Sequence, residues 1–276
     1  MTGLYSPTSG EAFVSGNSIK ENIAKVQQLI GYCPQFDVLW SELTVEEHLY
    51  FYTKLKNVDN NKVKEIVDKT LENTKLTKFR NFLVCELSGG MKRRLSLGIS
   101  LVGDPKIVFL DEPTTGLDPE NKRQIWEILS QCKQNKCMIL TTHLMEEAEI
   151  LADRIGIIVN GKLKCLGTKF KLKREYGRGF KLTINFKSDN LVHDDDYYKC
   201  SEDIDNFIKL VFENSEKREG YKTTLVYFIS NDEFDAEKLF NEINEKKESL
   251  KISNWAISQV SLEDIFIKLT EDDIYT

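Results

Sequence analysis

Two spacings of apolar residues alternate along the first part of the chain. Apolar side chains three or four positions apart predict amphipathic helices, whereas short unbroken apolar runs predict strands buried on both faces. The predicted helices cover residues 18–29, 44–55, 63–76, 91–102, 144–152 and 168–176, with a further helix that begins at Asp118. The predicted strands cover 11–14, 30–33, 106–110 and 137–142, followed by a hairpin at 154–166. Strands that alternate with helices predict an α/β domain with a parallel sheet.

Beyond Gly167 the pattern changes. Alternation of apolar and polar residues predicts a half-buried strand at 180–186. Further strands are expected near 223–229 and 252–260. Helical spacing returns at 204–212, 234–243 and 262–269. The acidic stretch 189–205, which contains His193, is interpreted as a solvated loop. These elements predict a second, smaller domain of the α+β class.

The expected domains follow from these changes in pattern. The α/β domain covers 1–167, and residues from about 44 to 100 form an α-helical subdomain within it. Residues 168–179 form a linker, and the α+β domain covers 180–276.

Composition excludes several classes of function. The 276 residues carry 38 basic and 44 acidic side chains, and a net charge of -6 gives no field for holding nucleic acid. The run Lys92-Arg93-Arg94 is interpreted as a solvated helix face. The six cysteines form no CxxC pair, which favours a reduced, cytosolic setting. We expect no transmembrane segment, because no apolar run approaches the length of about 18 residues that a bilayer requires.

Acidic and basic side chains end two of the predicted parallel strands. Asp111 and Glu112 follow the strand 106–110, and His143 follows the strand 137–142. Because α/β proteins bind ligands at the carboxyl ends of their strands, this edge is expected to form a phosphate and magnesium site. Adjacent residues at a strand end point to different sides, so the two carboxylates are expected to act differently.

Two further motifs begin helices near this edge. The first is the run Leu87-Ser88-Gly89-Gly90-Met91. Ser88 suits the N-cap position, and the glycines let an anion approach the positive end of the helix dipole. The second is Gly116-Leu117-Asp118-Pro119, in which Asp118 is an N-cap and the proline occupies the first turn.

These motifs, in this order, resemble the nucleotide-binding domain of ATP-binding cassette (ABC) transporters, which has a P-loop NTPase-like, RecA-like fold. The resemblance implies ATP and Mg2+ as cofactors. It makes Glu112 the general base, His143 the switch at the γ-phosphate, and Asp111 a magnesium ligand through water. Gln35, after Pro34, matches the Q-loop, whose glutamine touches magnesium and the attacking water.

The resemblance also implies a second nucleotide-binding domain as partner. Leu87 to Met91 match the signature, which contacts ATP held by that second domain, and Gly116-Leu117-Asp118 match the D-loop, which crosses to it. Residues 260–266, with Thr141-Thr142-His143, are similar to the A subfamily. That similarity implies lipid export at the cytosolic face of a membrane, with substrate choice in transmembrane domains outside this chain.

One family motif is absent from the sequence. No GxxxxGK[ST] pattern, the Walker A loop that cradles the phosphates, occurs in the 276 residues. We expect a chain cut just after that loop and inactive by itself. Two alternatives stay open. The chain is a catalytically incomplete interaction protein that gives its signature face to a complete nucleotide-binding domain, or a soluble ABC-type ATPase of translation or repair.

Overall fold

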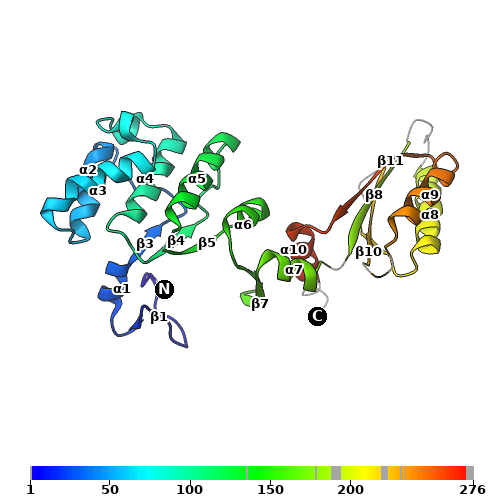
Figure 1. Cartoon of the computed structure of the whole chain (residues 1–276), viewed down its shortest axis with the longest axis horizontal. Coiled ribbons are helices and arrows are strands. Elements are labelled where there is room, and N and C mark those ends of the chain that lie inside the picture. The colour runs from blue at the N-terminus through cyan, green and yellow to red at the C-terminus, as the bar shows by residue number, and fades with distance from the viewer. Residues whose placement is uncertain are drawn as a thin grey trace. The chain divides into compact units, whose positions relative to one another are not determined.

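A computed structural model describes residues 2–134, 136–177, 179–187, 194–218, 223–230, 232 and 234–271. His193 lies outside the described residues. The chain forms two compact units, Met1–Leu151 and Ala152–Thr276 (Figure 1). The hairpin and helix after residue 152 thus belong to the second unit, whereas the sequence analysis assigns the hairpin to the first domain. The domain limits at 167 and 179 stay a prediction.

A parallel sheet forms the centre of the first unit. Its strand order is β3 (Ile30–Cys33), β4 (Ile107–Asp111) and β5 (Cys137–Thr141). Cys33 pairs with Leu110, and Asp111 pairs with Thr141. The three strands therefore end at one edge, and the residues that follow each strand leave the sheet together.

Helices and a short hairpin surround this sheet. The hairpin consists of β1 (Phe13–Val14) and β2 (Asn17–Ser18), and the helices are α1 (Ile23–Leu29), α4 (Gly89–Leu101), α5 (Pro119–Cys132) and α6 (Met145–Leu151). The helix predicted from residue 18 begins later, because residues 17 and 18 pair with β1. Val108 and Leu110 of β4 pack with Leu97 of α4 and Ile128 of α5 in one buried cluster.

The helical subdomain packs against the outer side of α4. It contains α2 (Val45–Leu55), α3 (Asn60–Asn73) and two short 3-10 turns at Thr77–Phe79 and Val84–Glu86. Thr44 and Glu47 form a capping box at the start of α2. Buried Leu49, Leu71 and Leu95 join α2, α3 and α4 in one core. This core holds the start of α4 in place.

The second unit begins with β6 (Ile155–Val159), β7 (Lys162–Gly167) and α7 (Lys169–Glu175). Asn160 and Gly161, between the two strands of this hairpin, both have positive φ, as a type I′ turn requires. A four-stranded antiparallel sheet follows, in the order β11 (Ile252–Gln259), β8 (Phe180–Phe186), β10 (Thr224–Ile229) and β9 (Glu216–Arg218). The α+β character predicted for this region is present.

Helices α8 (Asp194–Val211) and α9 (Ala236–Lys246) cover one face of that sheet (Figure 1), and α10 (Leu262–Glu271) ends the described chain. The loop predicted at 189–205 is wrong from residue 194 onward, where α8 begins. Ile204, Phe207 and Ile208 are buried in the core of the unit, whereas Glu202 and Asp203 are exposed. Acidic residues on one face do not prevent a helix whose other face is apolar.

None of the helices within the described ranges is both long enough and apolar enough to cross a membrane.

The buried carboxylate of Asp264 links the start of α10 to the sheet. Ser261 donates to Asp264 Oδ2 from its backbone nitrogen (2.9 Å) and from its hydroxyl (2.6 Å). Lys181 Nζ of β8 lies 2.7 Å from Asp264 Oδ1, and the Asp264 side chain is 8% exposed. Burial raises the pKa of Asp264, but the hydrogen bonds from Lys181 and Ser261 outweigh it and hold the pKa below 3.8.

We expect Asp264→Asn to lower the free energy of unfolding of the second unit by about 1–3 kcal/mol at neutral pH, because a charged hydrogen-bond acceptor is lost. When folding lowers the pKa of a carboxyl, the group stabilises the folded protein at pH values above its unfolded-state pKa. That stability is lost as the pH falls through the folded-state pKa. The difference in free energy of unfolding between the wild type and Asp264→Asn should therefore become smaller as the pH falls. Urea unfolding at several pH values measures it, with the exposed Glu263→Gln as control. A difference independent of pH would contradict this assignment.

Candidate functional site

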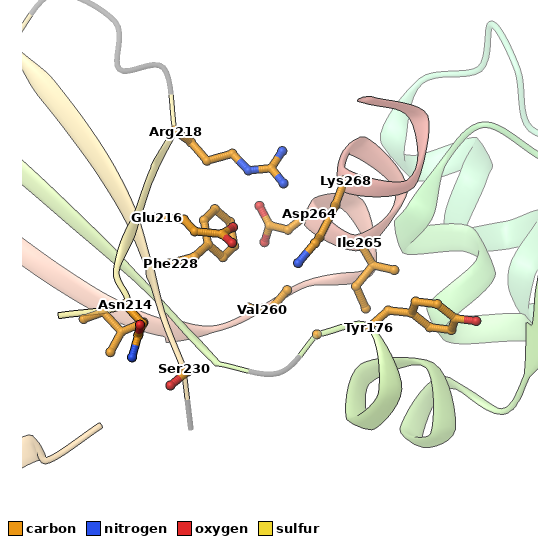
Figure 2. Close-up of a pocket in the computed structure, with 12 residues that line it drawn as sticks. Tyr176, Asn214, Glu216, Arg218, Phe228, Ser230, Val260, Asp264, Ile265 and Lys268 are labelled. Atoms are coloured by element: carbon orange, nitrogen blue, oxygen red, sulfur yellow. The ribbon is translucent and has the colours of Figure 1, made fainter. Parts of the chain in front are cut away.

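Within the described residues, two groups of polar side chains are considered as candidate sites. One is a recess of about 90 Å³ in the second unit, where Asp264 and Lys268 of α10 face Arg218 and Glu216 of β9 (Figure 2). Its charged groups are of both signs, and its lining residues include neither histidine nor cysteine. The other is the carboxyl edge of the parallel sheet in the first unit, which holds the predicted site residues.

Three side chains converge on one oxygen of Glu112. Gln35 Nε2 donates to Glu112 Oε2 over 3.2 Å, and Thr115 Oγ1 donates to the same oxygen over 3.0 Å. His143 Nδ1 lies 3.4 Å from it. The Glu112 side chain is 28% exposed and that of His143 is 60% exposed, so the cluster lies open to solvent. The ends of β3, β4 and β5 each contribute one of Gln35, Glu112 and His143.

The backbone of Glu112 is strained. Its φ is 43°, a left-handed conformation that costs a residue other than glycine about 1–3 kcal/mol. The turn is held by the Glu112 backbone nitrogen, which donates to the carbonyl oxygen (3.1 Å) and to the hydroxyl (3.3 Å) of Thr141. Such outliers cluster at functional sites.

The two adjacent carboxylates have different partners. Asp111 Oδ1 accepts a hydrogen bond of 2.5 Å from Thr141 Oγ1, whereas Glu112 contacts Gln35, Thr115 and His143. No group of three or more histidine, cysteine, aspartate or glutamate side chains in the described ranges could enclose a metal ion. A single carboxylate at an open edge fits Mg2+, which keeps several waters and binds through one or two carboxylates plus phosphate oxygens.

The signature residues lie at the start of α4. Ser88 caps this helix, because its hydroxyl accepts from the Met91 backbone nitrogen over 3.3 Å. A Cβ at Gly89 would meet nothing within 4 Å, whereas a Cβ at Gly90 would lie 2.2 Å from Asn121 Oδ1. Gly89 therefore keeps the helix end open, and Gly90 permits close approach of α5.

Asn121 joins the signature to the predicted D-loop. Its backbone nitrogen donates to Asp118 over 3.3 Å, so Asp118 is the N-cap that the sequence predicts, and its side-chain amide also donates to Asp118. These hydrogen bonds from Asn121 lower the pKa of the Asp118 carboxyl. Asn121 is a contact that sequence reasoning missed.

The predicted site residues thus form two groups. Gln35, Asp111, Glu112 and His143 meet at the edge of the sheet, with hydrogen bonds or close contacts to Glu112 and Thr141. Leu87 to Met91 lie at the start of α4, and Gly116, Leu117 and Asp118 lie at the start of α5; Gly90 and Asp118 both contact Asn121. Their catalytic and binding roles stay predictions.

The interpretation of the basic run as a solvated face is wrong. Arg93 is 4% exposed and Arg94 is 8% exposed. Arg93 Nε donates to the Pro113 carbonyl over 2.7 Å, and Arg94 Nη1 donates to the Thr74 carbonyl over 3.1 Å. The signal in the sequence is the rest of α4, where small residues such as Ser96, Gly98 and Ser100 predict a helix buried on all sides.

A buried glutamate, Glu147 on α6, is a further contact that sequence reasoning missed. Its side chain is fully buried, and its Oε1 accepts from Thr114 Oγ1 (2.8 Å) and from Trp126 Nε1 (3.0 Å). Thr114 follows Glu112 by two residues, and His143 immediately precedes the segment that leads into α6. Glu147 therefore joins the loop after Glu112 to the helix after His143.

Comparison with known proteins identifies regions in both units. Residues 1–115 match the family model described as ABC transporter. Residues 177–259 match the model described as ABCA1-like, C-terminal R1 regulatory domain. A solved ATP binding subunit of an ABC transporter is 26% identical, with a TM-score of 0.58 over 64% of this chain and 74% of that chain. This likeness confirms the P-loop NTPase-like fold.

Curated relatives match along almost the whole chain. ABC transporter A family member 2 of Arabidopsis thaliana is 39% identical over 277 residues, which cover 98% of this chain and 28% of that protein. ABC transporter A family member 7 of Dictyostelium discoideum is 39% identical over 273 residues, which cover 99% of this chain and 32% of that protein. The chain therefore spans less than a third of the length of these two relatives.

Gln35 and Glu112, at the edge of the parallel sheet, lie within residues 1–115, which match the family model for the ABC transporter, whereas His143 lies beyond that match. The second unit contains the match to the ABCA1-like regulatory domain. Because members of the A family are similar to this chain along nearly its full length, the chain belongs to the A family of ABC transporters.

Proposed function

We propose that this chain is part of an ATP-hydrolysing nucleotide-binding domain that powers transport. The observation that carries the proposal is the convergence of Gln35, Thr115 and His143 on one oxygen of Glu112 at the open edge of the sheet. A carboxylate held in this way, beside a second carboxylate with its own partner, suits a general base next to a magnesium ligand.

Glu112 is the proposed general base. It accepts a proton from the attacking water, while Gln35 and His143 keep its carboxylate oriented toward the reacting phosphate. Asp111 would hold Mg2+ through water, and the bound ion would supply charge neutralisation at the phosphates of ATP. The strained turn at residue 112 supports this assignment, because backbone outliers of this kind cluster at functional sites.

The signature at the start of α4 is proposed to bind ATP held by a second nucleotide-binding domain. The open space at Gly89 and the helix N-terminus capped by Ser88 suit a phosphate approaching from another molecule. Asp118 and its D-loop lie beside the signature, joined to it through Asn121. Both predicted partner-facing motifs therefore share one region of the unit.

Transmembrane domains of the same transporter are the other proposed partner. Large apolar side chains stand exposed just after Gln35 and along α2, including Phe36 (78%), Val38 (67%), Tyr50 (50%) and Phe51 (45%). Exposed apolar side chains such as these suit a contact with another protein. It would place the chain at the cytosolic face of a membrane. Lipid as the transported molecule rests on the family resemblance.

Ser88→Arg tests the proposed contact with a second nucleotide-binding domain. A bulky cation at the capped helix end should abolish ATP-dependent association with a complete nucleotide-binding domain, because it fills the space that the phosphate requires. Pull-down with and without ATP measures this. Loss of the N-cap by itself costs about 1 kcal/mol, so thermal unfolding is measured alongside.

Ser130→Arg is the matched control for this experiment, since Ser130 is exposed near the far end of α5 and gains the same charge. Equal loss of association in both variants, or unchanged association of Ser88→Arg, contradicts the proposed role of the signature. The alternative function, an interaction protein without hydrolysis of its own, predicts the same association. It differs in predicting no role for Glu112 in turnover.

A further inference from the structure

Arg93 donates hydrogen bonds to both segments that carry the proposed catalytic residues. On one side, Nη1 donates to the Pro34 carbonyl over 2.6 Å and to Asp37 Oδ1 over 3.0 Å. Pro34 and Asp37 lie on either side of Gln35, within two residues. One atom of Arg93 therefore holds the Q-loop before and after its glutamine.

On the other side, Arg93 holds the turn that contains Glu112. Nη2 donates to the carbonyl oxygens of Asp111 (3.1 Å) and Glu112 (3.2 Å), and Nε donates to that of Pro113 (2.7 Å). These three consecutive carbonyls surround the residue with the strained φ. The five N–H donors of a guanidinium form a fixed planar fork, and five acceptors meet Arg93 here.

The charge of Arg93 is compensated within the same network. Its side chain is 5% exposed, and Asp37, whose side chain is 23% exposed, supplies the opposite charge. A buried cation is tolerated when it is paired and fully hydrogen-bonded. Rigid packing around such a fork leaves the two segments little freedom to move independently.

We propose that Arg93 is a positioning residue, which fixes the Q-loop and the Glu112 turn relative to each other from the signature helix. Ser88 caps helix α4 and Arg93 lies on it, so a displacement of the signature would reach Gln35 and Glu112 through this guanidinium. The inference rests on the proposed function in one respect, namely that Glu112 is the base. The mechanical link between the two segments does not depend on it.

Arg93→Lys tests this link because lysine keeps the charge opposite Asp37 but lacks the fork that reaches both segments. In the 276-residue chain, amide hydrogen exchange should become about tenfold faster at residues 35–37 and 111–115. Arg94→Lys is the matched control, since Arg94 donates to the carbonyls of Thr74 and Lys75. It should speed exchange near residue 75 and leave the other two segments unchanged.

Asp37→Asn tests the Q-loop half of the network by itself. It also keeps the proposal testable if Arg93→Lys fails to fold. It removes the charged partner on the Q-loop side only, so faster exchange should be confined to residues 35–37. If exchange in Arg93→Lys stays at the wild-type rate in either segment, the link is overturned. General acceleration throughout the chain in both Arg93→Lys and Asp37→Asn overturns it as well.

Turnover gives the functional half of the test. In the assembled transporter that contains this chain, Arg93→Lys should lower kcat for ATP by about 100-fold, because a small displacement of a catalytic group has an effect of that size. KM for ATP should change less than about threefold. Combined with Glu112→Gln, Arg93→Lys should add nothing further. Arg94→Lys should keep wild-type turnover.

The outcomes separate the two proposals. If Glu112→Gln abolishes turnover but Arg93→Lys leaves it unchanged, the positioning role is overturned and the proposed function stands. If Glu112→Gln has no effect, the proposed function fails. Hydrogen exchange then decides alone whether Arg93 links the two segments.

Discussion

Replacing Glu112 by glutamine is expected to lower the rate of ATP hydrolysis in the assembled transporter by about 10²- to 10⁴-fold, the usual effect of removing a general base. The amide has nearly the shape of the carboxylate. Its oxygen can occupy the position of Oε2 and accept from Gln35 and Thr115 as before. Local geometry is kept, and only the ability to accept a proton is lost. ATP binding should therefore persist while turnover stops.

Steady-state hydrolysis and equilibrium ATP binding, measured on the same preparation, test this expectation. Glu146→Gln is the matched control, because Glu146 is exposed on α6, near His143 in the chain. It should retain wild-type turnover. Activity of Glu112→Gln within about twofold of wild type would exclude Glu112 as the base and favour a chain that only lends its signature to a partner.

The sequence predicts the edge where the site lies because parallel strands have few alternatives. An apolar run ending in Asp111 and Glu112 reads as a buried strand, and a second such run leads to His143. Two parallel neighbours then bring their ends together, and in the structure Asp111 pairs with Thr141. Helix starts at Ser88, Asp118 and Thr44 are equally local, since each depends on one side chain that caps its own helix.

Buried charges are where sequence reasoning fails. Arg93 and Arg94 follow Lys92 in a run that resembles a solvated face, yet both guanidiniums bind carbonyl groups from elements distant in sequence. Nothing in their own helix identifies those partners. The positive φ of Glu112 is likewise set by contacts with Thr141, 29 residues away in the chain. The prediction of a loop at the acidic start of α8 fails for a related reason, because the apolar face that stabilises this helix begins further along the chain.

Glu147 offers the second large effect, this time on stability. Its Oε1 is the shared acceptor of Thr114 and Trp126, and its Oε2 has no hydrogen-bond partner among the described residues. Glu147→Leu should lower the free energy of unfolding of the first unit by about 2–5 kcal/mol, because two buried donors lose their acceptor. Glu147→Gln should cost little, since an amide oxygen still accepts and a neutral group is easier to bury than a carboxylate.

Urea unfolding of the 276-residue chain and its two variants measures this contrast, with Glu146→Gln as the exposed control one residue earlier. The ratio of the two effects is more informative than either alone. If Glu147→Gln destabilises as much as Glu147→Leu, the negative charge itself is required, and a cation must reach Oε2. If it destabilises little, Glu147 acts as a hydrogen-bond acceptor that fixes Thr114, and with it the loop after Glu112, against the helix α5 that carries Trp126.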